Sequence, residues 1–188
     1  MHNIKNMMRM TVAVLAASLL ISFDANAALK IGDKAPDFVA QAAVGGKEFT
    51  FSLADALKKG PVVLYFYPKS FTKGCTIEAH EFADAAETFA ASGASLIGMS
   101  ADNIDIQKQF STMECRDKFP VAADPEMKVI RAYDAVMTSL PGKTDISDRT
   151  SYVIAPDGTV LYTFTELAPN KHVENTLAVV QDWRKAHP

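Results

Sequence analysis

Apolar and polar residues follow one another along the chain in patterns that predict strands and helices in turn. Val62–Tyr67 is a continuous apolar run of β-forming residues, which is typical of a strand buried on both faces. From Cys75 to Ser92 the apolar residues recur at helical spacing, and Gly93 favours the end of that helix. The centre of the chain is therefore expected to be a buried strand followed by an amphipathic helix.

The same patterns predict the remaining elements. Strands are expected at Phe38–Ala40, Lys47–Phe51, Leu96–Met99, Val121–Ala123, Ser151–Ile154 and Val160–Phe164. Helices are expected after Ser52, after Asp102 or Asn103 with Ile106, Phe110 and Met113 facing inward, from Asp124-Pro125, and at Val173–Ala186. Residues 134–149 are expected to form a long loop. This order predicts an α/β fold, a thioredoxin-like mixed sheet flanked by helices, with an N-terminal hairpin extension.

The first 27 residues have the pattern of a signal peptide. A weakly basic start precedes the apolar run Met10–Phe23, and Ala25-Asn26-Ala27 supplies the small-x-small pattern that signal peptidases cleave. The apolar run is shorter than the roughly 20 residues of a membrane span, although an uncleaved anchor is the alternative. We therefore expect a mature chain that starts at Ala28 in a bacterial periplasm or outside the cell.

Residues 28–188 are expected to form one domain, and their composition indicates no cofactor. The formal net charge is −3, so the chain has no basic surface for nucleic acid. The histidines of the expected mature chain, His80, His172 and His187, are scattered rather than clustered as metal ligands are. No glycine-rich phosphate loop is present. We expect neither a metal nor a cofactor.

Cys75, one of only two cysteines, carries the candidate chemistry. It follows the buried strand, Pro68 and Gly74, and it opens the predicted helix, where free backbone N–H groups and the helix dipole favour a thiolate. The alternative is a buried cysteine that acts as a small hydrophobic residue. A lower pKa also reduces the nucleophilicity of the sulfur, so a fast reaction needs other groups that stabilise the transition state.

Two residues of the preceding turn are candidates for such groups. Thr72 places a hydroxyl one turn ahead of the sulfur, where it can exchange hydrogen bonds with a bound oxygen, although a helix cap explains it equally well. Pro68 fixes the turn and can shield the thiolate from water, or it is simply a turn proline.

The spacing Pro68-x-x-x-Thr72-x-x-Cys75 resembles the active-site signature of the peroxiredoxins, thiol peroxidases with a thioredoxin-like fold. The stretch from Tyr65 to Ala79 is most similar to the bacterioferritin-comigratory (Q-type) branch of the alkyl hydroperoxide reductase/thiol-specific antioxidant family. The segment 148–158 resembles the strand that carries the family's active-site arginine. The likeness spans residues 30–183.

This resemblance implies a role for each candidate residue. Cys75 would be the peroxidatic nucleophile, whose thiolate attacks a hydroperoxide and becomes a sulfenic acid. Thr72 would bind the peroxide by a hydrogen bond, and Arg149 would stabilise the thiolate and the breaking O–O bond. From the residues alone, Arg149 is a charged residue beside Asp148 that a surface ion pair would also explain.

The sequence leaves the regeneration of Cys75 open. Members of the branch often carry a resolving cysteine five residues after the nucleophile, where this chain has His80. His80 is expected to be a solvent-facing helix residue, and a proton donor is the weaker alternative. Cys115 lies opposite the predicted inward face of its helix and is expected to be exposed. Resolution by Cys115 in an intramolecular disulfide, a one-cysteine mechanism and a permanent structural disulfide are the alternatives.

The leading hypothesis is thus an exported thiol peroxidase for hydrogen peroxide or organic hydroperoxides. A thiol–disulfide oxidoreductase of the same fold is the rival, but Cys75-Thr-Ile-Glu78 lacks its usual second cysteine. A redox sensor is the non-enzymatic alternative. The expected reductant is a periplasmic thioredoxin-like thiol protein, and the resemblance favours a monomer.

Overall fold

The computed structural model describes residues 29–138 and 140–188. The predicted signal peptide therefore lies outside the described residues. Within the described residues, no helix combines the length and the hydropathy that crossing a membrane requires.

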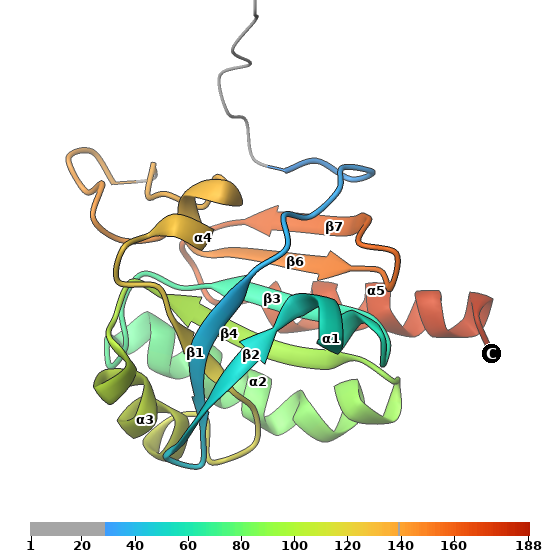
Figure 1. Cartoon of the computed structure of the whole chain (residues 1–188), viewed down its shortest axis with the longest axis horizontal. Helices are drawn as coiled ribbons and strands as arrows, with labels where there is room; N and C mark the ends of the chain where they lie inside the picture. Colours follow the sequence, from blue (N-terminus) through green and yellow to red (C-terminus); the bar gives the residue numbers. More distant parts are fainter. Residues whose placement is uncertain (1–28, 139) are drawn as a thin grey trace, which may run out of the picture.

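Seven strands form one mixed sheet in the order β2-β1-β5-β4-β3-β6-β7 (Figure 1). Their bounds are β1 Val39–Val44, β2 Lys47–Ser52, β3 Val62–Phe66, β4 Ser95–Ser100, β5 Val121–Ala123, β6 Thr150–Ile154 and β7 Val160–Thr165. The central strands β3, β4 and β5 are parallel, whereas the other neighbours pair antiparallel. The predicted mixed sheet and its N-terminal hairpin are confirmed.

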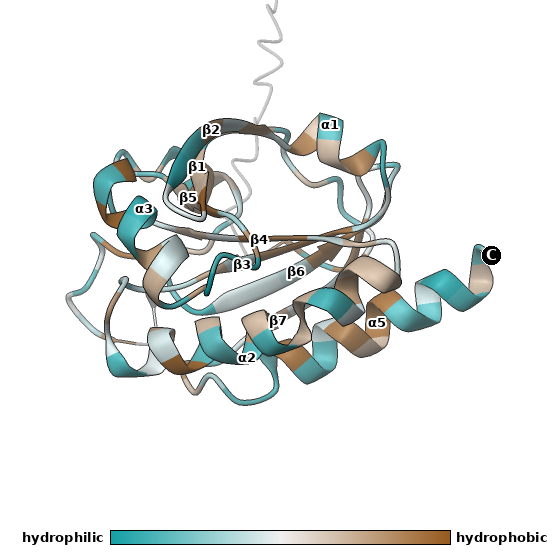
Figure 2. Ribbon diagram, turned by 90° about the horizontal axis from the view of Figure 1, so that it is seen from below, coloured by the Kyte–Doolittle hydropathy of each residue, from teal (hydrophilic) through white to brown (hydrophobic). Residues whose placement is uncertain are grey.

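In the described part of the chain, five helices pack around the sheet. Their bounds are α1 Leu53–Leu57, α2 Lys73–Ala91, α3 Ile104–Met113, α4 Lys128–Ala132 and α5 His172–Ala186. Helices α2 and α5 lie side by side on one face, while α1 lies on the opposite face (Figure 2). Helix α3 packs against β1 and β5.

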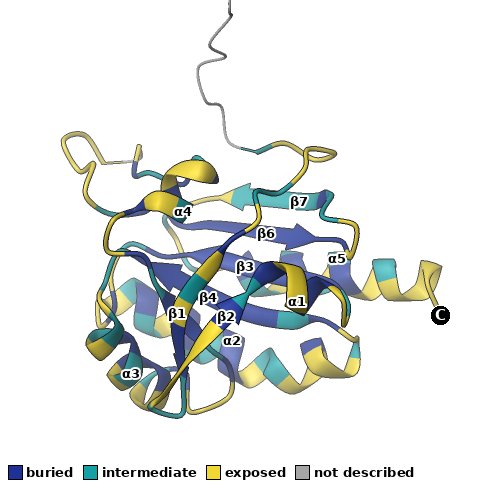
Figure 3. Ribbon diagram, in the orientation of Figure 1, coloured by how far each residue is buried: buried dark blue, intermediate teal, exposed yellow. Residues whose placement is uncertain are grey.

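The residues of β3 are buried on both faces because each face of the sheet carries its own apolar cluster (Figure 3). Leu64 belongs to the cluster beneath α1 and α4, and Tyr65 belongs to the cluster beneath α2 and α5. The Tyr65 ring stacks on Phe82 of α2 with ring centroids 4.3 Å apart. Such a pair adds about 1 kcal/mol to the burial of the two rings, so it fixes α2 against β3.

Two local predictions need correction. Helix α4 begins at Lys128 rather than at Asp124-Pro125, because the Asp124 carboxylate accepts hydrogen bonds from the backbone N–H groups of Lys128 and Ile130 and thereby ends β5 in a turn. Helix α3 is capped by Asn103, whose side chain accepts from Ile106 N. Its inward face is formed by Gln107, Phe110 and Ser111, whereas Met113, expected inside, is exposed.

Candidate active site

Cys75 lies in the first turn of α2, which begins at Lys73. Its side chain is only 2 % exposed, and both cysteines of the chain are free. The first backbone N–H groups of a helix are not used by the helix itself, so they leave a positive end near the sulfur. The prediction that Cys75 follows a strand and a turn at the start of a helix is confirmed.

The turn before Cys75 is held in place from three sides. Ser70 N donates to the carboxylate of Asp102 at 2.7 Å, and the Ser147 hydroxyl donates to Tyr67 O at 2.7 Å. Phe71 adopts a left-handed backbone conformation with φ 63°, and its ring packs edge-on against Phe110. A non-glycine residue in that region is strained, so the surrounding contacts define the shape of the turn.

Thr72 and Pro68 lie in this turn at the positions that the spacing predicts. Thr72 is the N-cap residue of α2, but its side chain makes no capping bond and instead donates to Lys69 O at 2.9 Å. Pro68 is half-buried. The Thr72 hydroxyl is therefore not occupied by the helix.

Arg149 is buried in the site rather than paired at the surface. Its Nη2 lies 3.6 Å from Cys75 Sγ, its Nη1 donates to Glu78 Oε2, and its Nε donates to Leu167 O at 2.8 Å. The structure thus brings together Arg149, the residue before β6, and Cys75 of α2, which are 74 positions apart in sequence. A Cβ at Gly74 would lie 3.0 Å from Arg149 Nη2, so the glycine leaves room for this approach.

Glu78 is a buried carboxylate that the sequence analysis did not single out. It lies on α2 and is fully buried, and its Oε1 has no hydrogen-bond partner while Oε2 accepts from Arg149. Burial raises the pKa of Glu78 to about 8, and Arg149 opposes that rise. Burial disfavours the charge on Arg149, but Glu78 and Cys75 outweigh it and raise the Arg149 pKa. The spacing of three residues from Cys75 places Glu78 on the same helix face, a signal that could have identified it.

Cys115 is fully buried, so the prediction that it is exposed is wrong. Helix α3 ends at Met113, and the chain then turns back through Arg116 and Asp117, which both have positive φ. The helical spacing used for the prediction therefore does not extend to Cys115. Burial raises the pKa of the Cys115 thiol, and Glu114 and Asp117 add to that rise, so the protonated form is favoured.

His80 lies near the end of α3 rather than free in solvent. Its side chain is 36 % exposed, and its Nε2 lies 2.7 Å from Glu114 Oε2. Besides this histidine–glutamate contact, two ion pairs join α2 to the segment after α3, Asp84 with Arg116 at 2.7 Å and Glu87 with Lys118 at 2.9 Å. We call these three pairs the α2 ion-pair ladder.

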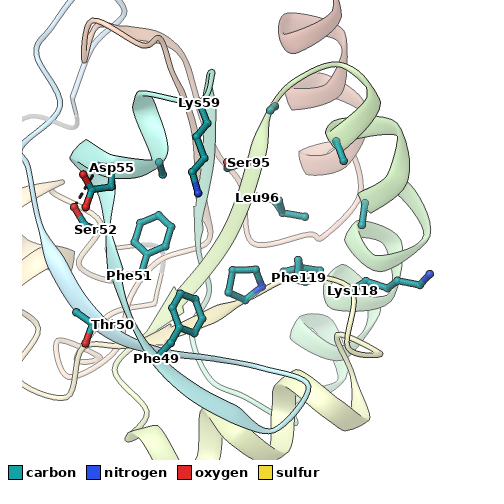
Figure 4. Close-up of a pocket in the computed structure, with 15 residues that line it drawn as sticks. Phe49, Thr50, Phe51, Ser52, Asp55, Lys59, Ser95, Leu96, Lys118 and Phe119 are labelled. Carbon is teal, nitrogen blue, oxygen red and sulfur yellow. Dashed lines mark hydrogen bonds between the residues drawn. The ribbon is translucent and has the colours of Figure 1, made fainter.

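A cavity of about 470 Å³ is lined by residues that do not include Cys75, Glu78 or Arg149. Phe49 and Phe51 of β2, Leu96 of β4 and Phe119 line it, and Lys118 lies at its rim (Figure 4). None of these residues contacts the thiol–arginine pair by a hydrogen bond or an ion pair. The candidate chemistry is therefore located by the contacts of Cys75 and not by the cavity.

The fold and these contacts define a class: a thioredoxin-like protein with a buried thiol beside an arginine at a helix start. The model of the AhpC/TSA family matches residues 31–163. Peroxiredoxin Bcp of Bacillus subtilis is 32% identical over 156 residues, which cover 82% of this chain and 96% of that protein. Peroxiredoxin Q of Triticum aestivum is 35% identical over 129 residues, which cover 66% and 56% of the two chains.

A solved structure agrees with these sequence relatives. Peroxidoxin BcpB from Mycobacterium tuberculosis superimposes with a TM-score of 0.73 at 33% identity, covering 82% of this chain and 97% of that one. The chain therefore belongs to the AhpC/TSA family. It is an enzyme of the peroxiredoxin class, a thiol peroxidase.

Proposed function

We propose that Cys75 is the peroxidatic cysteine and that it reduces hydrogen peroxide or organic hydroperoxides. The observation that carries this proposal is the 3.6 Å contact between Arg149 Nη2 and Cys75 Sγ inside the protein. The thiolate attacks one peroxide oxygen, the O–O bond breaks, and water or an alcohol leaves after taking up a proton. Cys75 becomes a sulfenic acid.

Arg149 supplies the charge that this reaction needs. A guanidinium is always protonated and presents several N–H donors in one plane. With Nη1 and Nε held by Glu78 and Leu167 O, Nη2 remains directed at the sulfur. A donor fixed in advance stabilises the negative charge that passes from sulfur to the leaving oxygen without reorganising during the reaction.

Thr72 and Pro68 complete the proposed site. The Thr72 hydroxyl, whose hydrogen is donated to Lys69 O, accepts a hydrogen bond from the bound peroxide, or donates to it by giving up the bond to Lys69 O. Pro68, half-buried after β3, limits the access of water to the sulfur. Neither residue reacts covalently, so their substitution should slow the reaction less than loss of Cys75.

We propose that Cys115 resolves the sulfenic acid by forming an intramolecular disulfide with release of water. Cys115 is buried behind the α2 ion-pair ladder and has a raised pKa. Resolution therefore requires the segment 114–118 to open and the start of α2 to unwind locally. The two consecutive residues with positive φ, Arg116 and Asp117, favour this segment as the moving part because their strain is released on opening.

Mass spectrometry of the protein after one equivalent of hydrogen peroxide tests both steps. The proposal predicts oxidation at Cys75 followed by a Cys75–Cys115 disulfide, and Cys115→Ser should stop the reaction at the sulfenic acid. A sulfenic acid that persists at Cys75 in the wild type would contradict resolution by Cys115 but not the peroxidase reaction. Oxidation at Cys115 with an unmodified Cys75 would contradict both.

We further propose that the protein is exported, acts as a monomer and is reduced by a periplasmic thioredoxin-like thiol protein. The support for export is the sequence of the first 27 residues, with its apolar run and Ala25-Asn26-Ala27. Expression of the full chain in a bacterium, followed by the mass of the periplasmic product, tests export. A product that starts at Ala28 is expected, and a cytoplasmic product of full length would contradict it.

A further inference from the structure

His172 is a fully buried histidine that the proposed reaction does not use. It is the first residue of α5, and its ring lies edge-on to Phe164 with centroids 4.8 Å apart. Its Nε2 lies 2.9 Å from Glu166 O, and its Nδ1 lies 2.8 Å from Ser151 Oγ. Both ring nitrogens are therefore occupied in the interior of the protein.

The partners of the ring define its tautomer. A carbonyl oxygen can only accept, so Nε2 carries the hydrogen and donates to Glu166 O. Burial lowers the pKa of His172 to about 4, so the ring is neutral near pH 7 and Nδ1 accepts from the Ser151 hydroxyl.

The ring connects to Arg149 through the turn that follows β7. Glu166 O accepts from His172, and the next carbonyl, Leu167 O, accepts from Arg149 Nε at 2.8 Å. Glu166 N also donates to Arg149 O at 3.2 Å. A ring that fixes Glu166 therefore fixes the carbonyl that orients the guanidinium.

The ring also faces the second partner of Arg149. Nδ1 lies 3.8 Å from Glu78 Oε1, the carboxylate oxygen without a hydrogen-bond partner. Because Nδ1 accepts from Ser151, it offers Glu78 no hydrogen. The Glu78 carboxylate is thus left with Arg149 as its hydrogen-bond donor.

We propose that His172 is a positioning residue for peroxide reduction: its neutral ring clamps the turn 166–167 and, with Glu78, holds Arg149 Nη2 against Cys75. This inference rests on the proposed role of Arg149. It assigns no contact between His172 and the peroxide.

The test compares three substitutions in a Cys115→Ser background, so that Cys75 is the only thiol. His172→Leu removes both hydrogen bonds of the ring. His172→Gln keeps one donor and one acceptor. Thr176→Val removes the bond from Thr176 Oγ1 to His172 O on the same helix without contacting Arg149, and it serves as the matched structural control.

Three quantities are measured for each: the melting temperature, the thiolate content of Cys75 at pH 7 by ultraviolet absorbance, and the rate of the first reaction with hydrogen peroxide. His172→Leu is expected to lower the thiolate content and to slow the first reaction about tenfold or more, since small displacements of a catalytic group have effects of that size. His172→Gln should recover most of the rate. Thr176→Val should lower only the melting temperature.

The proposal is overturned if His172→Leu leaves thiolate content and rate unchanged, if His172→Gln is as slow as His172→Leu, or if Thr176→Val slows the reaction equally. Should His172→Leu not fold, Ser151→Ala replaces it: a slower reaction supports the proposal and an unchanged one contradicts it. Arg149→Gln separates this inference from the proposed function. An unchanged rate in Arg149→Gln rejects the role of Arg149, whereas a slow Arg149→Gln with a fast His172→Leu rejects only the role of His172.

Discussion

At the scale of single residues, the site depends on one cation shared by a sulfur and a carboxylate. Arg149 contacts both Cys75 and Glu78, and all three side chains are almost fully buried. Inside a protein, a charge that loses its partner is costly, so Arg149 and Glu78 depend on each other for stability as well as for chemistry.

Arg149→Gln should therefore destabilise the protein by about 1 to 3 kcal/mol at pH 7, because Glu78, whose raised pKa favours its neutral form there, loses its buried hydrogen-bond donor. The double substitution Arg149→Gln with Glu78→Gln should recover part of this loss, since an amide at position 78 can both donate and accept a hydrogen bond. Urea unfolding at pH 7 measures both. Equal stabilities of the single and double variants would show that Glu78 does not depend on Arg149.

His172 predicts a pH dependence of stability with a definite sign. Its folded-state pKa is about 4 and its ordinary value is 6.5, so between these pH values the unfolded chain binds a proton that the folded chain does not. As pH falls from about 6.5 to about 4, this residue should remove up to about 3 kcal/mol of stability. The raised pKa of Glu78 acts in the opposite direction, because its contribution is lost as pH rises from 4.5 towards 8.

Comparison of the wild type with His172→Gln isolates the histidine, since Glu78 is present in both proteins. The free energy of unfolding, measured in urea from pH 7 to pH 4, should fall less steeply in His172→Gln. Parallel curves for the two proteins would mean that His172 takes up its proton over the same pH range in the folded and unfolded states, against its assignment as a neutral acceptor.

At the scale of elements, α2 carries Cys75, the proposed reactive thiol, in its first turn, and its later turns contact the segment that contains Cys115. His80, Asp84 and Glu87 recur at helical spacing and pair with Glu114, Arg116 and Lys118. Periodicity identified α2 and its inward face from the sequence. Periodicity could not predict the burial of Cys115, because the helix ends at Met113. No local sequence pattern predicts the positive φ values of Arg116 and Asp117 that follow.

The α2 ion-pair ladder should control access to Cys115. In a Cys75→Ser background, Asp84→Asn with Glu87→Gln removes two of the three pairs. Since exposed pairs each contribute between about 0.2 and 1 kcal/mol, labelling of Cys115 by a maleimide should become about fivefold faster. High salt should also speed the labelling of Cys115 in the protein with an unaltered ladder, because salt screens the exposed pairs.

Asp182→Asn is the matched control, because it breaks the ion pair of Asp182 with Lys185 within α5. It should leave the labelling rate unchanged. A rate that responds neither to the ladder substitutions nor to salt would mean that Cys115 becomes accessible by a different opening.

At the scale of the whole molecule, the sheet order explains which residues could be predicted to meet. Strands β3 and β6 pair antiparallel, with Phe66 opposite Thr150, so the end of β3 that leads to Cys75 lies beside the start of β6, which directly follows Arg149. The sequence pattern predicted the strands, and the family resemblance predicted the role of Arg149. Glu78 and His172 were not predicted. The three-residue spacing from Cys75 indicates the helix face of Glu78 but not its burial, and a lone histidine carries no local sign of burial.

The central claim is that Cys75, oriented by Arg149, reduces peroxide. Stopped-flow measurement of peroxide consumption, comparing wild type, Cys75→Ser and Cys115→Ser with free cysteine as the reference, tests it most directly. The account predicts that wild type and Cys115→Ser complete a first turnover orders of magnitude faster than free cysteine, and that Cys75→Ser does not react. Retained peroxide reduction in Cys75→Ser, or a wild type no faster than free cysteine, would contradict it.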